Sequence, residues 1–511
     1  MGPVKTISLT LMLLTAACQP LWAQYAQAEA VPEEYRAGWE DFDAKTCKKW
    51  LTILASDKFA GRSTGTKGYQ LAADFMAKRF KEFGLKPIGD NGSYFQHVPF
   101  ARLETQPKKC WIEVVGQKPS RLKASAGIAF GHRMSGRPAL GSGKLEGEVL
   151  FIRARGKNAA LKDPSIMDGK ILLINSRNDL KAPLRRQVRE SKALAVLIVK
   201  NSVSKAHLRS QSGLKMAADL HISAFIQEKA AKKLAKSLGL DPKLMTKPKE
   251  DMIEFQVLER RIKLNAAAKR KDILVPNVVG LIEGSDPDLS KEVVILGSHL
   301  DHIGKTGKKI NNGADDDGSG STAILAIARA MSRTPTKPKR SIMFIAVCGE
   351  EMGLLGSRYY TENPILPIKA TVCELQMDMI GRNEEDKSRG ERARDNIDTL
   401  HLVGSKRLSM ELHEFIMDCN RHLKFKFEYD EEDVYTRSDH YNFAKKGIPV
   451  AFVFSGFHPD YHKPTDTVDK INFKKLVSVA RLYYLVALKV ANQTKRIVVD
   501  SGPLATPGVG N

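Results

Sequence analysis

The sequence has few cysteines, and their spacing does not form a disulfide framework. It contains six cysteines in 511 residues, and the five that follow the N-terminal region are scattered at positions 47, 110, 348, 373 and 419. Small secreted domains that depend on disulfides carry an even number of cysteines in a compact pattern. The sequence therefore excludes that class of protein, and we expect free buried thiols, or such thiols with one bridge.

Long apolar runs are absent beyond the N-terminus. Lys5 precedes a mainly apolar stretch at residues 7–17, and Ala26-Gln27-Ala28 then has the spacing of a signal-peptidase site. We expect residues 1–28 to be a cleaved signal peptide and the protein to be secreted or periplasmic. A lipid anchor at Cys18 stays an alternative, although the leucine usual three residues before such a cysteine is missing. No later segment is apolar enough to span a bilayer, so we predict no transmembrane segment.

The chain is strongly basic, but it has no basic run interleaved with aromatic residues. The net charge is +23, and Lys and Arg are spread over nearly the whole length. A nucleic-acid groove would need those charges to be clustered. We therefore predict no nucleic-acid partner and interpret the charge as a general surface property, with acidic peptides or anionic envelope polymers as possible electrostatic partners.

Two segments near the start of the mature chain have helical spacing. CKKWLTILASDKF and GYQLAADFMAKRFKEFGLKP, both within residues 46–87, place apolar residues three and four positions apart. The stretch AGRSTGTKG at residues 60–68 lies between them, and its Gly, Ser and Thr content is typical of a loop. We expect two packed helices joined by this loop.

The region from Gly143 to Leu258 has a different character. GEVLFIRA, GKILLIN and LAVLIVKN are short β-rich runs, and the amphipathic stretch QEKAAKKLAKSLG follows them. No His, Cys or carboxylate cluster with the spacing of metal ligands occurs here. We interpret the region as a separate, non-catalytic insert.

The part from Asn277 to Asn492 alternates apolar runs with helical patterns. This alternation predicts an α/β fold, a mostly parallel sheet flanked by helices. Polar groups follow several of its apolar runs directly: His299 and Asp301, then Glu350 and Glu351, then Asp378, then His458 and His462. Since ligands of open α/β sheets bind outside the carboxyl ends of the strands, we expect these groups to converge on one crevice.

The chemistry of these groups indicates a metal site. Imidazoles mixed with carboxylates, without a usable thiolate, favour zinc, with cobalt or manganese as substitutes. The carboxylates are too many for one catalytic zinc, but they suit two ions about 4 Å apart that share a bridging carboxylate. Of the adjacent Glu350 and Glu351, one can bind metal while the other takes a proton from water.

These motifs resemble the co-catalytic di-zinc aminopeptidase family, the family twenty-eight metallopeptidases. The resemblance rests on SHLDHIG, NNGADDDGSGS, CGEEMGLLGS, LQMDMIG, SDHYNFAKKGIP and YHKPTDT, which occur in the family's order. The β-rich insert resembles the protease-associated domain of many bacterial members. The implied organisation is a signal peptide (1–28), the N-terminal part of the peptidase domain (29–142), a protease-associated insert (143–258), the main metallopeptidase domain (259–492) and a C-terminal tail without regular structure (493–511).

The resemblance also implies roles for single residues. The five implied ligands of two zinc ions per chain are His299, Asp316, Glu351, Asp378 and His462. Asp316 would bridge the ions, and Glu351 and Asp378 would bind opposite ones.

Three further residues match catalytic groups of the family. Glu350 matches the general base, Asp301 the residue that orients His299, and Tyr461 a donor to the developing oxyanion. Asp315 and Asp317 are expected to be scaffolding, with Asp317 accepting amide hydrogens of the next helix. His302 and His458 are left as pocket-wall or surface residues. Ser438-Asp439-His440 is not expected to be a catalytic triad, because no nucleophile elbow accompanies it. The resemblance instead implies that this segment lies near the substrate pocket, so Asp439 is expected in the pocket wall.

The sequence thus predicts an exported zinc exopeptidase that acts on peptides, most simply an aminopeptidase. A glutamate-carboxypeptidase-like hydrolase is the first alternative, and it would need a basic pocket beside the metals. A glutaminyl cyclase, which uses one zinc, and a receptor-like binding protein that has lost its metals are the others. The sequence does not indicate an oligomeric state or a side-chain preference.

Overall fold

The structure is a computed structural model. It describes residues 28–500 except 117–120, 124–126, 131–132, 135–136, 139–141, 178–181, 204–211, 217–221, 247, 249, 386–391, 393, 395 and 430–433. The predicted signal peptide, apart from its last residue, and Cys18 therefore lie outside the described residues. So do positions 501–511 of the predicted tail.

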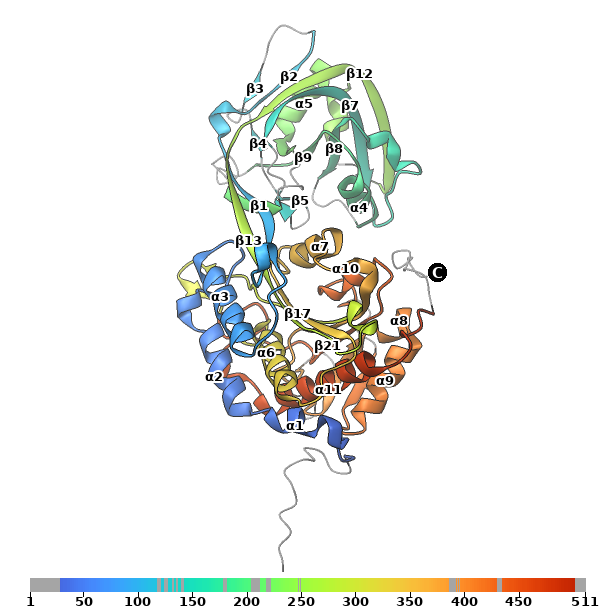
Figure 1. The fold of residues 1–511 in the computed structure, drawn as a ribbon. Coiled ribbons are helices and arrows are strands. Elements are labelled where there is room, and N and C mark those ends of the chain that lie inside the picture. Colours follow the sequence, from blue (N-terminus) through green and yellow to red (C-terminus); the bar gives the residue numbers. More distant parts are fainter. Residues whose placement is uncertain are drawn as a thin grey trace, which may run out of the picture.

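A nine-stranded mixed sheet forms the centre of the lower lobe in Figure 1. Its four middle strands, in the order β17-β14-β18-β21, are parallel, and antiparallel strands extend it on both sides. This confirms the predicted α/β class. In sheet order the strands are β10 (Ser212–Met216), β1 (Phe95–Thr105), β13 (Ala268–Ile282), β17 (Ser341–Val347), β14 (Val293–His299), β18 (Thr371–Met377), β21 (Val450–Phe454), β19 (Thr399–Val403) and β20 (Lys426–Glu428).

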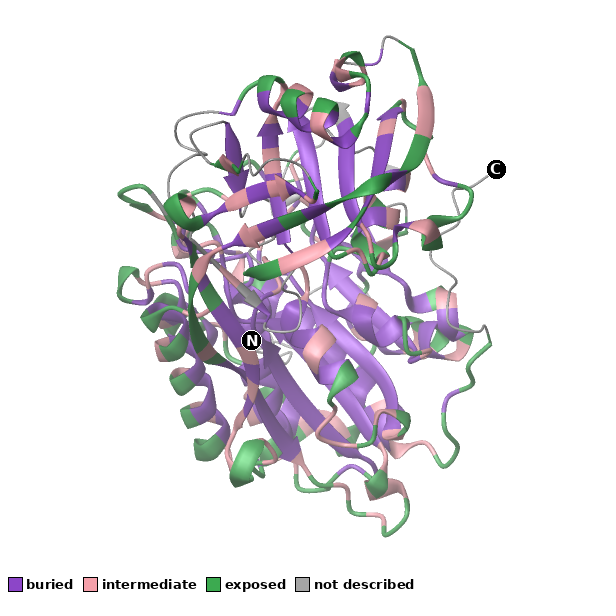
Figure 2. Ribbon diagram, turned by 90° about the horizontal axis from the view of Figure 1, so that it is seen from above, coloured by how far each residue is buried: buried purple, intermediate pink, exposed green. Residues whose placement is uncertain are grey.

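Helices cover both faces of this sheet. Side chains of a strand alternate between faces, so Val294 and Leu296 of β14 pack into one core and Val293 and Ile295 into another. The first core contains residues of α1 (Glu33–Asp41), α2 (Ala44–Leu54), α3 (Lys67–Glu82), α6 (Gly318–Arg333), α9 (Met410–Asn420) and α11 (Phe473–Asn492). The second contains residues of α7 (Leu355–Glu362), α8 (Ser405–Leu408) and α10 (His440–Ala444). In Figure 2 the central strands are accordingly buried along their length.

A second, eight-stranded sheet forms the upper lobe. Its order is β3 (Leu122–Lys123), β2 (Trp111–Val114), β12 (Met252–Ala266), β7 (Gly143–Arg155), β8 (Ile171–Arg177), β9 (Ala195–Lys200), β11 (Ile222–Gln227) and β4 (Ile128–Phe130). It has its own apolar core, to which α5 (Glu228–Leu238) contributes, and α4 (Ala182–Glu190) packs beside it. The predicted insert boundaries at 143 and 258 stay a prediction.

A two-stranded ribbon joins the lobes. β1 and β13 pair antiparallel without interruption from Phe95 opposite Val278 to Thr105 opposite Ala268. In Figure 1 both strands run from the lower sheet up to the second one. The chain thus leaves the first lobe along β1 and returns along β13, and between these two strands β10 pairs with β1 at the edge of the nine-stranded sheet.

Several smaller predictions can be compared with the structure. The two expected helices are α2 and α3, with the loop of residues 60–68 between their ends apart from its last two positions. The five described cysteines are buried and unbridged. Among the described helices, none has the length and apolarity needed to cross a bilayer. Residues 493–500 contain no helix or strand, but they pack on the fold, and Ile497 is buried.

Candidate metal centre

The structure brings together the five predicted ligands at the carboxyl end of the parallel strands. His299 ends β14, Asp378 follows β18, Glu351 lies in the turn after β17, and His462 lies in the segment after β21. Asp316 lies in the turn just before α6. Two buried strands, the turn before one buried helix and two segments that follow strands therefore position these side chains.

The carboxylate of Asp316 faces two different groups. Its Oδ1 lies 3.2 Å from His299 Nε2, which is itself 3.4 Å from Asp378 Oδ1. Its Oδ2 lies 3.0 Å from His462 Nε2, which is 3.2 Å from Glu351 Oε2. Each oxygen of Asp316 thus faces its own cluster, which contains one predicted imidazole ligand and one further predicted carboxylate ligand. His302 also lies near the second cluster, 3.7 Å from Asp316 Oδ2.

These spacings fit tetrahedral zinc. Zinc lies about 2.0–2.1 Å from imidazole nitrogen and about 2.0–2.2 Å from carboxylate oxygen, so two ligands of one tetrahedral ion lie roughly 3.3 Å apart. The four nitrogen-to-oxygen distances given above are 3.0 to 3.4 Å. The residues present can therefore hold metal, and the division of Asp316 between two clusters suits a pair of ions. His299 and Asp316 are almost fully buried, so a dication would compensate carboxylate charge that solvent does not reach.

The pKa values of the two imidazoles also indicate a site that attracts cations. Burial lowers the pKa of His299, but the attraction of Asp378 and Glu350 outweighs it and raises the pKa well above the usual value. Burial likewise lowers the pKa of His462, and its hydrogen bonds to Asp316 and Glu351 raise it to about 10. The cluster therefore attracts cations strongly, and metal binding would displace protons from both imidazoles.

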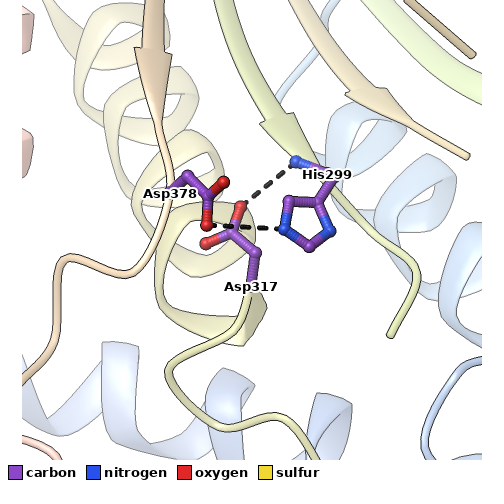
Figure 3. Close-up of side chains that lie close together, drawn as sticks. All are labelled: His299, Asp317 and Asp378. Atoms are coloured by element: carbon purple, nitrogen blue, oxygen red, sulfur yellow. Dashed lines mark hydrogen bonds and ion pairs between the residues drawn. The ribbon is translucent and has the colours of Figure 1, made fainter. Parts of the chain in front are cut away.

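Asp317 connects three of the elements that carry the site (Figure 3). Its Oδ2 accepts a hydrogen bond of 3.1 Å from the His299 amide, and its Oδ1 accepts one of 3.2 Å from the amide of Met379, next to Asp378. The same Oδ1 accepts from the amide of Gly320 in the first turn of α6, as the sequence predicted. Asp317 therefore fixes the ends of two strands relative to the helix that follows Asp316.

Asp315 contacts residues that are not predicted ligands. Its carboxylate accepts a hydrogen bond of 2.7 Å from the Gly381 amide and lies 3.2 Å from His458 Nε2. Asp466 accepts from the amides of Asp315 and Asp316. His458 is buried, so it is not a surface residue, and it supports the turn that carries Asp316.

The main chain and the side chain of Asp301 contact different residues. Its main-chain carbonyl oxygen lies 2.9 Å from His299 Nδ1, whereas its carboxylate is 3.8 Å from that nitrogen. The carboxylate accepts from the Glu350 amide at 3.1 Å and from Thr64 Oγ1 at 2.8 Å. The main chain of Asp301 thus orients His299, and its carboxylate fixes the start of the turn that carries Glu350.

Arg62, which the sequence analysis did not single out, and His302, which it left as a pocket-wall or surface residue, are both buried near the site. Arg62 is buried below the site and donates to the carbonyl oxygens of Leu54, Leu300, Asn312 and Gly313. It therefore links the end of α2 to the chain before Asp316. His302 is buried, with Nδ1 2.8 Å from Glu351 Oε1, so it is not a surface residue and lies behind a predicted ligand. Their only signal in the sequence was an Arg within a Gly-rich loop and the second His of SHLDHIG.

Glu350 and Tyr461 line a pocket that opens on the two clusters. Burial raises the pKa of Glu350 well above its usual value, and Glu351 and Asp378 add to this, while the pKa of Tyr461 is also raised by burial. Glu350 Oε2 is 4.0 Å from His299 Nε2, close to that cluster but beyond hydrogen-bonding distance. The rest of the wall is mostly apolar and consists of Met379, Val434, Phe452, Phe454 and Phe457, with Ser438 and Arg437. Asp439, in contrast, is buried against Ser357 and is not among the residues that line this pocket.

Ser438→Ala is expected to weaken zinc binding by about tenfold, because partners of metal ligands typically contribute 10–100-fold to metal affinity. Ser438 Oγ donates to Asp378 Oδ2 at 2.7 Å and fixes the direction of that carboxylate. Zinc affinity in competition with a chelator checks the effect. Ser455→Ala is the matched control, since the Ser455 hydroxyl is buried and has no hydrogen-bond partner among the described residues. Equal zinc affinity in both variants would contradict the role of Ser438.

Comparisons with known proteins find relatives over part of this chain. A probable leucine aminopeptidase of Arthroderma otae is 32% identical over 225 residues, which are 42% of this chain and 58% of that protein. Leupeptin-inactivating enzyme 1 of Streptomyces exfoliatus is 32% identical over 195 residues, 38% of each chain. The chain thus spans less than two thirds of the length of these relatives.

The fold is also found in a solved structure. The aminopeptidase from Aneurinibacillus sp. strain AM-1 matches with a TM-score of 0.51 and 21% identity, covering 92% of this chain and 98% of that one. The model of peptidase family M28 matches residues 277–487, which contain all five predicted ligands, Glu350 and Tyr461. This match confirms the predicted resemblance to peptidase family M28 over residues 277–487.

Proposed function

We propose that this protein is an exported aminopeptidase that depends on two zinc ions. One observation carries the proposal: the two oxygens of Asp316 face separate clusters, His299 with Asp378 and His462 with Glu351. The family of residues 277–487 and the names of the relatives support a peptidase. The apolar N-terminal run supports export, through a signal peptide or an anchor at Cys18.

His299, Asp316, Glu351, Asp378 and His462 would hold the ions. Zinc supplies Lewis acidity, which lowers the pKa of a water molecule and polarises the substrate carbonyl. Glu350 takes the proton from the attacking water and later gives it to the leaving amine. The Tyr461 hydroxyl, in the wall of the same pocket, donates to the oxygen on which charge develops. The Asp301 carboxylate keeps the Glu350 amide in place.

The pocket supports an N-terminal substrate residue with an apolar side chain. Met379, Val434, Phe452, Phe454 and Phe457 offer an apolar wall next to the clusters. The carboxylates of Glu350 and Asp378, which line the same pocket, attract a free α-amine. An apolar side chain and a free amine on the same residue are the features that an aminopeptidase recognises.

One observation favours a second candidate, a carboxypeptidase. Arg437 lines the pocket beside the clusters, and its guanidinium donates to the Tyr461 hydroxyl at 3.4 Å. An Arg at this position can bind a substrate carboxylate. A one-metal glutaminyl cyclase and a metal-free binding protein are less well supported, because two complete clusters and the Glu350 carboxylate are present.

Blocking the ends of one peptide distinguishes the two candidates. With Leu-Gly-Gly as the substrate, N-terminal acetylation is expected to abolish leucine release, because the amine then loses its charge and its fit to the carboxylates. C-terminal amidation is expected to leave most of the rate. Amino-acid analysis of the released residues measures both. Loss of turnover on amidation, with turnover kept on acetylation, would replace the aminopeptidase with the carboxypeptidase.

A further inference from the structure

A carboxyl group that belongs to neither cluster, that of Glu374, is fully buried in the central sheet. Glu374 lies on β18, on the same face as Gln376 and Asp378, because successive side chains of a strand alternate between faces. Its partners on the adjacent strands are apolar: Ile295 of β14 on one side and Val450 of β21 on the other. Neither oxygen of Glu374 has a hydrogen-bond partner among the described residues. An ionised carboxylate is very costly to bury in such surroundings.

Two hydrogen bonds lead from Gln376 to a predicted metal ligand. Ser438 Oγ donates to Asp378 Oδ2 at 2.7 Å. A hydroxyl group has one proton, so the Ser438 oxygen can only accept from its other neighbour, and Gln376 Nε2 donates to it at 3.2 Å. The negative charge of Asp378 therefore sets the direction of both hydrogen bonds. The amide nitrogen of Gln376 faces Ser438, and its oxygen is left for a different neighbour.

That neighbour is Glu374. Gly297 of β14 lies beside Gln376 in the parallel ladder, and a Cβ atom on Gly297 would collide with both Gln376 Oε1 and Glu374 Oε1. The two oxygens thus share the space that the missing side chain of Gly297 leaves. Gln376 Oε1 has no donor among the residues that the structure describes. Two acceptor oxygens can pair only when one carries a proton, and of these two groups the carboxyl group is the one that can be protonated.

The surroundings of Glu374 favour this proton. Burial raises the pKa of Glu374 well above its usual value, and the buried carboxyl group of Asp439 raises it further. Burial also raises the pKa of Asp439, to about 7. A neutral Glu374 carboxyl group with a hydrogen-bond partner is therefore much less costly to bury than an ionised one without a partner.

We propose that Glu374 is protonated in the working enzyme and donates to Gln376, so that both are positioning residues for the metal ligand Asp378. The proposal rests on the proposed function, in which Asp378 binds zinc. Protonated Glu374 keeps the Gln376 amide in one orientation. That amide leaves Ser438 free to donate to Asp378, and the direction of the Asp378 carboxylate follows. We call these four residues the β18 relay.

Two substitutions of Glu374 distinguish a donor from an anion. Glu374→Gln keeps the size of the side chain and offers Gln376 an N–H donor in place of the O–H, so zinc affinity and kcat are expected to stay at wild-type values. Glu374→Met keeps the bulk without a donor. Its zinc affinity is expected to fall about threefold, less than the roughly 10–100-fold that direct partners of metal ligands contribute. Competition with a chelator measures zinc affinity in both variants.

A double variant and a packing control make the test specific to the β18 relay. In a Ser438→Ala background, Glu374→Met is expected to cause no further loss of zinc affinity, because the relay is already broken at Ser438. A packing defect alone would add to the effect of Ser438→Ala. Ile295→Val removes one buried carbon atom beside Glu374 and leaves the relay intact. It is expected to keep its zinc affinity even if it unfolds at a lower temperature.

Infrared difference spectra of the wild type against Glu374→Gln detect the proton directly, and they cover the case in which Glu374→Met does not fold. At neutral pH we expect the carbonyl stretch of a protonated carboxyl group. Carboxylate bands in its place would overturn the proposal, as would wild-type zinc affinity in Glu374→Met or an equal loss in Glu374→Gln. These outcomes concern only the β18 relay. If the wild type itself binds no zinc and cleaves no peptide, the proposed function fails.

Discussion

Glu350→Gln is expected to reduce kcat by about 10³-fold and to leave zinc content unchanged. General acid–base catalysis typically contributes 10²–10⁴-fold, and glutamine cannot accept the proton that Glu350 is proposed to take. The side chain keeps its size and lies 4.0 Å from His299 Nε2, outside the closest contacts of the two clusters. Single-turnover rates on a leucine anilide measure the chemical step, and elemental analysis of the same sample measures bound zinc.

Glu362→Gln is the control for this variant. Glu362 is exposed at the end of α7, twelve positions along the chain, and the same chemical change there should have no effect on the rate. Turnover that survives in Glu350→Gln at the wild-type level would end its assignment as the base. Zinc lost along with turnover would instead assign Glu350 to metal binding.

Asp316→Asn is expected to lower bound zinc below two ions per chain and the rate on the order of 10³-fold, since metal ions stabilise charge in the transition state by several kcal/mol. An amide has one oxygen acceptor, so asparagine cannot present an anionic oxygen to both clusters. Zinc per chain after dialysis, measured by elemental analysis, checks this prediction together with kcat/KM.

Asp315→Asn provides the matched comparison one residue away. The Asp315 carboxylate contacts the Gly381 amide and His458, neither of which is a predicted metal ligand. This variant is expected to keep its zinc even if it unfolds at a lower temperature. If both variants kept the same zinc content, the bridging position of Asp316 would be wrong.

The sequence was sufficient for the parts of the site that are local in the chain. His299, Glu351 and Asp378 each directly follow an apolar run, and the carboxyl ends of parallel strands meet at one edge. That rule, with the family motifs, was enough to predict which residues would meet. The N-cap role of Asp317 could also be predicted from the sequence, since it depends on residues three positions apart.

Contacts between distant parts of the chain were not predictable in this way. Arg62 reaches the carbonyl oxygen of Leu300, and Thr64 the carboxylate of Asp301, across more than 230 positions. Whether the carboxylate or the carbonyl oxygen of Asp301 meets His299 depends on the main-chain direction after β14, which residue types do not specify. That Arg186 and Arg189 line one cavity with Glu350 depends on how the two lobes meet, which residue types do not specify.

The β1–β13 ribbon has a consequence for the modular history of the chain. Thr105 and Ala268 are direct partners in an antiparallel ladder that is continuous down to Phe95 and Val278. Two strands in that register can be closed by a two-residue turn such as Asn-Gly, without a shift of any residue below it. The upper lobe, together with the edge strand β10, could therefore be gained or lost at this point while the other strands of the lower sheet kept their alignment.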